Sequence, residues 1–127
     1  MAIRPILRFP DPLLRLPARE VATFDAELAA LADDLLETMR SVEGLGITAC
    51  HVGVPLRVVV IQPGRPDSAR SYVNPRILEA STERIRHPEG SVSLPGVIAE
   101  VERAARVRVG YQDLQGQSRI EEAEGFL

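Results

Sequence analysis

The sequence is poor in the residues that build disulfides and metal centres. It contains one cysteine, Cys50, and two histidines, His51 and His87. A single cysteine excludes an intrachain disulfide and a zinc site made of several thiolates. Since a protein without structural disulfides suits a reducing compartment, we expect a cytoplasmic location.

Long apolar runs are absent as well. No segment approaches the roughly 18 apolar residues needed to span a bilayer, and residues 1–5 lack the apolar core of a signal peptide. The formal net charge of -3 gives no electrostatic reason to expect nucleic acid or an anionic membrane as a partner. We therefore expect a soluble, unprocessed protein that binds neither.

The composition is that of an ordinary globular protein. Hydrophobic residues make up 45% and charged residues 26% of the 127 positions, which argues against disorder. The length suits one domain with a real core, and the sequence shows no internal repeat, low-complexity tract or linker. We therefore expect a single domain over residues 1–127.

One amphipathic helix is predicted near the N-terminus. Four prolines make the first segment extended, since each fixes its own φ and disfavours helix in the residue before it. Over residues 23–42, apolar side chains then recur at three- and four-residue spacing, which is typical of a helix with one buried face. Thr23 or Asp25 is suited to cap its start, and Gly44 or Gly46 supplies a stop signal.

After the helix the pattern favours β-strands. Residues 57–61 form a β-branched run, and 71–75 and 76–81 are further extended candidates. Apolar and charged residues alternate over 101–109, as in a half-buried strand. Turns are predicted at 64–68 and at 113–116, the latter as a hairpin turn. One helix followed by antiparallel-looking strands predicts the α+β class.

Two glycine-containing segments carry the strongest functional signal. They are Gly44-Leu45-Gly46-Ile47-Thr48-Ala49-Cys50-His51-Val52-Gly53 and Glu89-Gly90-Ser91-Val92-Ser93-Leu94-Pro95-Gly96. Taken singly, the first is typical of a helix end and loop, and the second of turns around a short strand. Glycines at such places let an extended ligand approach the backbone closely.

Together and in order, these segments resemble two of the three active-site motifs of the peptide deformylase family. The resemblance also covers residues 3–7, 10–15, 73–78 and 121–127. It implies a deformylase-like fold, with antiparallel strands packed around the one N-terminal helix, and an activity that removes formyl from the N-terminal methionine of new polypeptides. In that family a divalent metal such as Fe(II) is held by a cysteine and by two histidines of an HExxH helix, whose glutamate is the general acid/base.

The chain departs from that pattern at the positions that carry the chemistry. Ser91 occupies the cysteine position, and its neutral hydroxyl is a poor ligand for Fe(II) or zinc. His51 occupies the position of the glutamine that helps to stabilise the developing oxyanion. The 127 residues contain no His-Glu-x-x-His, so we expect the fold to lack the C-terminal metal-binding helix. We therefore expect no metal and no cofactor, with Fe(II) or zinc relevant only if family activity survives.

The resemblance also gives the candidate site residues. The catalytic positions are His51 and the backbone of Val92. The substrate-binding positions are Gly44, Gly46, Ile47, Gly90 and Leu94. The favoured interpretation is a deformylase-like protein without metal-dependent deformylation that still holds a formyl-methionyl peptide by strand-like pairing.

Three alternatives stay open. The first is a peptide deformylase after all, as a fragment or a divergent enzyme. The second is a nucleophile and base pair of Ser91 and His51, with Glu89 as the third group. The third is a structural module that self-associates or binds a partner through apolar sheet surface, which the missing helix leaves uncovered.

The remaining polar residues have structural interpretations. We expect Cys50 to be buried, on a strand whose neighbour His51 faces the other way. His87 is predicted on a loop, and Glu89 is predicted to make structural hydrogen bonds. Arg103 and Arg106 are predicted to be exposed strand charges.

Overall fold

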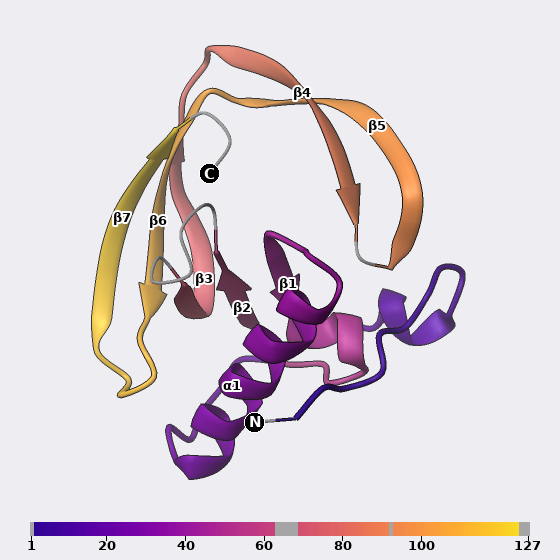
Figure 1. Ribbon diagram of the computed structural model, residues 1–127. Coiled ribbons are helices and arrows are strands. Elements are labelled where there is room, and N and C mark those ends of the chain that lie inside the picture. Colours follow the sequence, from indigo (N-terminus) through magenta and orange to yellow (C-terminus); the bar gives the residue numbers. More distant parts are fainter. Residues whose placement is uncertain (1, 63–68, 92, 125–127) are drawn as a thin grey trace.

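The computed structural model describes residues 2–62, 69–91 and 93–124. The strands β1, β2, β3, β6 and β7 form one sheet in that order, and β4 pairs with β5 in a second. All strand pairs are antiparallel (Figure 1). The bounds are η1 Pro12–Arg15, α1 Ala26–Ser41, β1 Gly46–Thr48, η2 Ala49–Val52, β2 Val58–Ile61, β3 Arg70–Ala80, β4 Arg84–Ser91, β5 Leu94–Ala104, β6 Arg106–Gln112 and β7 Ser118–Glu124. The predicted α+β class is confirmed, and the turn predicted at 64–68 lies outside the described residues.

The helix α1 forms because its start is capped and one of its faces is apolar. The carboxylate of Asp25, and not Thr23, accepts a hydrogen bond from the Leu28 amide at 3.1 Å, which satisfies one of the free donors at a helix start. The buried face of α1 packs on β1 and β2. The core that results consists of Val21, Leu28, Leu31, Leu35, Met39, Ile47, Ala49, Val58, Val60 and Val73.

The end of α1 differs from the prediction that a glycine would stop the helix. Glu43 takes the left-handed conformation, with φ 55°. The amides of Glu43 and Gly44 donate to the carbonyls of Arg40 and Met39, at 3.2 and 2.9 Å. This is the Schellman arrangement, which places the left-handed residue one position before the first glycine of the motif.

Glycine at position 43 is expected to stabilise the fold. A residue with a Cβ pays about 1 kcal/mol for the left-handed conformation, and glycine does not. We expect Glu43→Gly to raise the free energy of unfolding by about 0.5–1 kcal/mol in urea denaturation. Glu43→Ala is the matched control, since it removes the same carboxylate but keeps the Cβ. Equal stability of the two variants would contradict this explanation.

The long strand β3 is bent at Asn74, which adopts φ 50° where the register with β6 shifts. The Asn74 side chain fastens the segment before α1 to the sheet. Its Oδ1 accepts from the Val21 amide at 2.7 Å, and its Nδ2 donates to the Val21 carbonyl at 3.0 Å and to Gln112 Oε1 at 2.7 Å. The strands predicted at 71–75 and 76–81 are therefore one strand with an irregularity.

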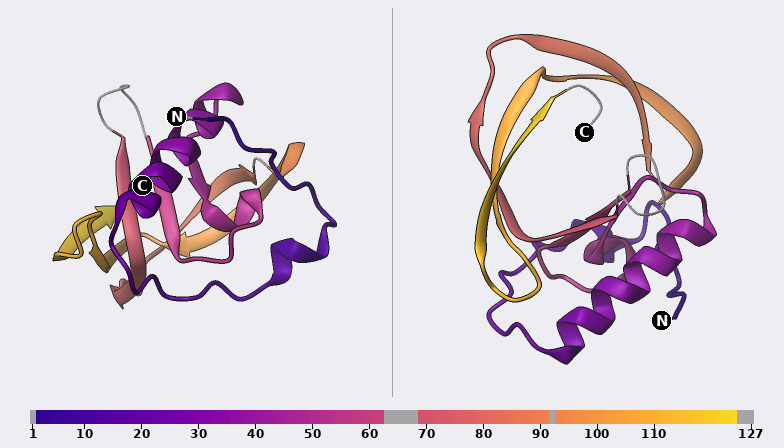
Figure 2. Two further views of the ribbon diagram at one scale, coloured as in Figure 1. Left: turned by 90° about the horizontal axis from the view of Figure 1, so that it is seen from below. Right: turned by 60° about the vertical axis from the view of Figure 1, so that its left-hand side comes forward.

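The strand predicted over 101–109 is two strands in two sheets. Ala105 separates β5 from β6, and its amide donates to the Glu83 carbonyl at 2.8 Å. From this point β4 and β5 continue as a long arched hairpin whose tip returns toward the N-terminal arm (Figures 1 and 2). The predicted alternation of exposed and half-buried side chains holds from Ala105 to Val109 but not over 102–105. Alternation alone does not say which partner strand a segment takes.

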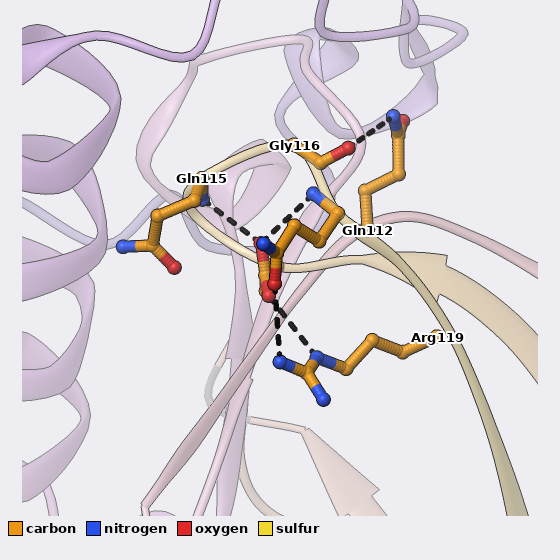
Figure 3. Close-up of polar contacts among 6 residues, drawn as sticks. Gln112, Gln115, Gly116 and Arg119 are labelled. Carbon is orange, nitrogen blue, oxygen red and sulfur yellow. Dashed lines mark hydrogen bonds and ion pairs between the residues drawn. The ribbon is translucent and has the colours of Figure 1, made fainter.

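The predicted hairpin turn at 113–116 is confirmed between β6 and β7. The Asp113 carboxylate accepts from the amides of Gln115 and Gln117, both at 3.0 Å, and from Arg119 Nε at 3.1 Å. Gly116 has φ 83° and donates its amide to the Asp113 carbonyl. Figure 3 shows this turn, with Gln112 reaching across to the Gly116 carbonyl. The turn therefore rests on an aspartate side chain and one left-handed glycine.

The N-terminal arm is extended as predicted, apart from the short helix η1. Ala2 and Arg4 hold the arm on α1 by hydrogen bonds to the two carboxylate oxygens of Asp34, at 2.8 and 2.9 Å. The Arg4 amide donates to the buried Thr38 hydroxyl at 2.8 Å. The bond from Ala2, followed by that from Arg4, holds the pKa of Asp34 below its ordinary value.

Candidate functional site

Three segments that are distant in the sequence meet at one place. They are η2, the tip of the β4–β5 hairpin, and the N-terminal arm. The Leu7 amide donates to the His51 carbonyl at 2.8 Å, and the Phe9 amide donates to the Ser93 carbonyl at 2.9 Å. Alternate residues of the arm therefore fix the two glycine motifs relative to each other, as the return of the hairpin tip in Figure 1 illustrates.

The first motif turns directly after β1. Cys50 and His51 lie in the short helix η2, so the prediction that they alternate along a strand is wrong. Cys50 is half-buried rather than buried. His51 is the third residue of η2, and its side chain reaches back to the amide of Thr48, the residue that caps the turn. An imidazole nitrogen thus does what a glutamate or glutamine does in a capping box.

The contacts of His51 determine which ring nitrogen carries the proton. Nδ1 lies 3.0 Å from the Thr48 amide and 2.9 Å from Thr48 Oγ1. Because an amide N–H can only donate, Nδ1 accepts, and in the neutral ring the proton is on Nε2. Burial lowers the pKa of His51 below its ordinary value. At neutral pH His51 is therefore an uncharged ring that donates through Nε2.

Ser91 lies opposite that donor. Its Oγ is 3.4 Å from His51 Nε2 and accepts from the Ser93 amide at 3.2 Å. Ser91 is exposed and His51 is half-buried, so a ligand can reach the Ser91 hydroxyl. Ser93 is 5% exposed, and its Oγ is buried without a hydrogen-bond partner among the described residues. The site therefore presents hydrogen-bond donors and neutral hydroxyls.

Ser91 and His51 come together, but not as a nucleophile and its base. The predicted proximity holds, since the two side chains are 3.4 Å apart. A general base needs a free lone pair on the nitrogen that faces the hydroxyl, and His51 Nε2 carries the proton. Nδ1, which an orienting carboxylate would hold, is bound to Thr48. The Glu89 carboxylate pairs with Arg103 at 3.0 and 3.2 Å, which confirms its predicted structural hydrogen bonds.

These residues do not fit a divalent metal. A metal requires lone pairs from thiolate, carboxylate or unprotonated imidazole. Here the Ser91 hydroxyl is neutral, and the imidazole nitrogen beside it is protonated. Within the described ranges, no three His, Cys, Asp or Glu side chains are grouped so as to hold a metal ion.

Of the predicted peptide-binding residues, Gly46 lies exposed on an outer strand of the five-stranded sheet. Ile47 is buried and belongs to the core, whereas Gly46 is exposed on β1, the outer strand of the five-stranded sheet. The Gln62 amide donates to the Leu45 carbonyl at 2.8 Å. Because hydrogen-bonded and non-bonded pairs alternate, Ile47 makes the next bonds to β2, and the N–H and C=O of Gly46 point away from it. Gly44 instead completes the helix cap.

The other predicted residues fall into three groups. Val92 lies outside the described residues, and Gly90 and Leu94 are placed only as backbone in β4 and β5. His87 is on the strand β4 and not on a loop, so that prediction is wrong. The exposed strand charges are confirmed: Arg103 pairs with Glu89 and Arg106 with Glu83.

Large apolar side chains are exposed on both sheets. Ile77, Ile98 and Ile120 are 68%, 74% and 67% exposed and lie on three different strands. A hollow of about 620 Å³ between β3, β6 and β7 is lined by Glu79, Ala80, Ser81, Arg106, Val107, Arg108, Glu122 and Ala123. Half of this lining is charged. Self-association through an apolar face stays a prediction, and no described helix is long and apolar enough to cross a membrane.

Sequence comparison identifies the relatives of the chain. A sequence profile described as polypeptide deformylase matches residues 3–127. A peptide deformylase-like protein of Bradyrhizobium diazoefficiens is 58% identical over 126 residues, which are 99% of this chain and 74% of that protein. One from Brucella melitensis is 54% identical over all of this chain and 77% of its own. A Rhizobium meliloti protein named peptide deformylase is 41% identical, over all of this chain and 75% of its own.

Solved structures show the same fold. The peptide deformylase of Thermotoga maritima superposes with a TM-score of 0.94 at 35% identity, covering 98% of this chain and 84% of that one. The Acinetobacter baumannii enzyme described as bound to Met-Ala-Ser superposes with a TM-score of 0.92 at 32% identity, covering 98% and 86%. The sequence profile, the relatives and the structures agree.

Proposed function

The chain belongs to the peptide deformylase family, and from that premise we propose that it binds N-formylmethionyl peptides without hydrolysing them through a metal. The observation that carries the proposal is the pair of Ser91 and His51. A neutral hydroxyl stands at the position of the metal-binding thiolate, and a protonated nitrogen faces it. A bound metal would acidify a water for attack on the formyl carbon, but a neutral hydroxyl is a poor metal ligand and the protonated Nε2 is none.

Peptide binding is supported by the free edge of β1. The outward N–H and C=O of Gly46 can pair with an extended peptide as an added strand. The His51 ring, held by the Thr48 amide, lies two residues further along the same edge. The hydrogen bonds that Leu7 and Phe9 of the N-terminal arm donate hold η2 and the tip of the β4–β5 hairpin in place. The edge of β1 and the donors His51 and Ser91 therefore form one preorganised surface.

The alternative function is deformylation by a divergent active site. In that case His51 Nε2–H would stabilise the oxyanion in place of glutamine, since it can donate a hydrogen bond to it. This alternative makes the opposite prediction about turnover, so one assay separates the two.

That assay is formate release from formyl-Met-Ala-Ser after anaerobic incubation with Fe(II) or Ni(II). We expect no formate above a protein-free control, because a neutral hydroxyl replaces the metal-binding thiolate at Ser91. The Rhizobium meliloti peptide deformylase, treated identically, is the positive control. Turnover by this chain that disappears in His51→Ala would establish a working active site and overturn the proposal.

A further inference from the structure

We propose that Thr48 is a positioning residue that fixes His51 as a hydrogen-bond donor, so that the site selects peptides with an acylated N-terminus over peptides with a free amine. This inference rests on the proposed peptide-binding function and adds its specificity. It concerns a contact between two residues that was not predicted from the sequence.

The first step is the position of Thr48 on the edge of β1. The outward-pointing groups of this strand belong to Gly46 and Thr48, since Ile47 bonds to β2. The outward N–H of Thr48 is occupied by His51 Nδ1 at 3.0 Å. The imidazole therefore occupies the next outward hydrogen-bonding position after Gly46 along the edge of β1. A peptide that pairs with Gly46 has its next group in front of the ring.

The second step is the direction of hydrogen bonding at that place. Thr48 binds Nδ1 through its amide and through Oγ1, and only the tautomer with the proton on Nε2 lets both groups donate to Nδ1. Ser91 Oγ, 3.4 Å from Nε2, already accepts from the Ser93 amide. At that length Nε2–H is weakly bonded and is available to a better acceptor.

The third step is the charge of the ligand that fits. The donors His51 Nε2–H and the Ser91 hydroxyl match an acyl oxygen, which only accepts. A free terminal amine is an ammonium at neutral pH and can only donate. Its N–H groups would therefore face the N–H of His51 Nε2, which also donates. The carboxylate of Glu89, in the second motif, already forms an ion pair with Arg103. The site therefore distinguishes the formyl oxygen, which accepts hydrogen bonds, from an ammonium, which donates them.

The experiment compares formyl-Met-Ala-Ser with Met-Ala-Ser by calorimetry at pH 7. We expect the wild type to bind the formylated peptide at least about tenfold more tightly, which corresponds to the difference between a satisfied and an unsatisfied donor. Thr48→Val, which keeps the shape but loses Oγ1, should weaken formyl-peptide binding about fivefold. Thr48→Ser should restore it to within about twofold.

A spectroscopic readout separates positioning from a merely structural role. Nitrogen-15 NMR of the His51 ring at pH 7 is expected to show the Nε2–H tautomer in the wild type and in Thr48→Ser. In Thr48→Val the amide still donates to Nδ1 but the second donor, Oγ1, is lost, so a larger share of Nδ1–H than in the wild type is expected. Equal affinity for the two peptides, or a wild-type ring with its proton on Nδ1, overturns the inference but leaves peptide binding intact. A wild type that binds neither peptide overturns the proposed function as well.

Discussion

Gly46→Pro is expected to weaken formyl-peptide binding strongly while the fold survives. Proline removes the outward N–H of Gly46 and places its ring where the added strand would lie. That N–H makes no bond to β2, and the φ of Gly46 is not in the left-handed region. We expect binding to weaken at least about 30-fold, equivalent to about 2 kcal/mol, in calorimetric titrations with formyl-Met-Ala-Ser.

Gly46→Ala is the matched control for this experiment. A Cβ at position 46 would lie 3.7 Å from the Val60 carbonyl oxygen and 3.8 Å from Ile61 Cγ1, which are ordinary contacts. The alanine variant keeps the N–H and should bind about as well as the wild type. Thermal unfolding of both variants checks the fold. If Gly46→Pro remains folded and binds the peptide normally, the edge of β1 is not the binding surface.

Asn74→Ala is expected to cause the largest loss of stability. It removes three hydrogen bonds that join Val21 and Gln112 to the bend of β3, and each is worth about 1 kcal/mol. It also forces alanine to adopt the φ of 50° that asparagine tolerates. We expect the free energy of unfolding to fall by about 3–4 kcal/mol in urea denaturation.

Asn74→Gly separates the two contributions. Glycine loses the same hydrogen bonds but accepts the left-handed conformation. Its loss should therefore be smaller than that of alanine by about 1 kcal/mol. Losses below 1 kcal/mol in both variants would show that the contacts of Asn74 do not hold the segment before α1.

The elements with a regular pattern could be predicted from the sequence. The apolar spacing of α1, the β-branched run of β2 and the turn after β6 each follow from local preferences that tertiary packing does not oppose. The division at Ala105 could not be predicted, because alternation over 101–109 is identical whether one strand or two continue it. The left-handed Glu43 was hidden by Gly44, which offered a more obvious helix stop.

The proximity of His51 and Ser91 was predicted, but the hydrogen bonding around them was not. The resemblance correctly brought His51 and Ser91 together, and their contact confirms the shared position of the two motifs. The contact of Thr48 with His51 was missed because it depends on η2, which was predicted as a strand. The sequence signal for this contact was the spacing of a capping box: Thr48 stands three positions before His51, whose side chain can accept a hydrogen bond.

The central claim is binding without turnover, and one titration tests it most directly. Formyl-Met-Ala-Ser is titrated into the protein in the presence of Ni(II), and the peptide is then recovered and weighed by mass spectrometry. The account predicts saturable binding and recovery of the peptide with its formyl group intact. Recovery as Met-Ala-Ser, or the absence of saturable binding, would contradict it.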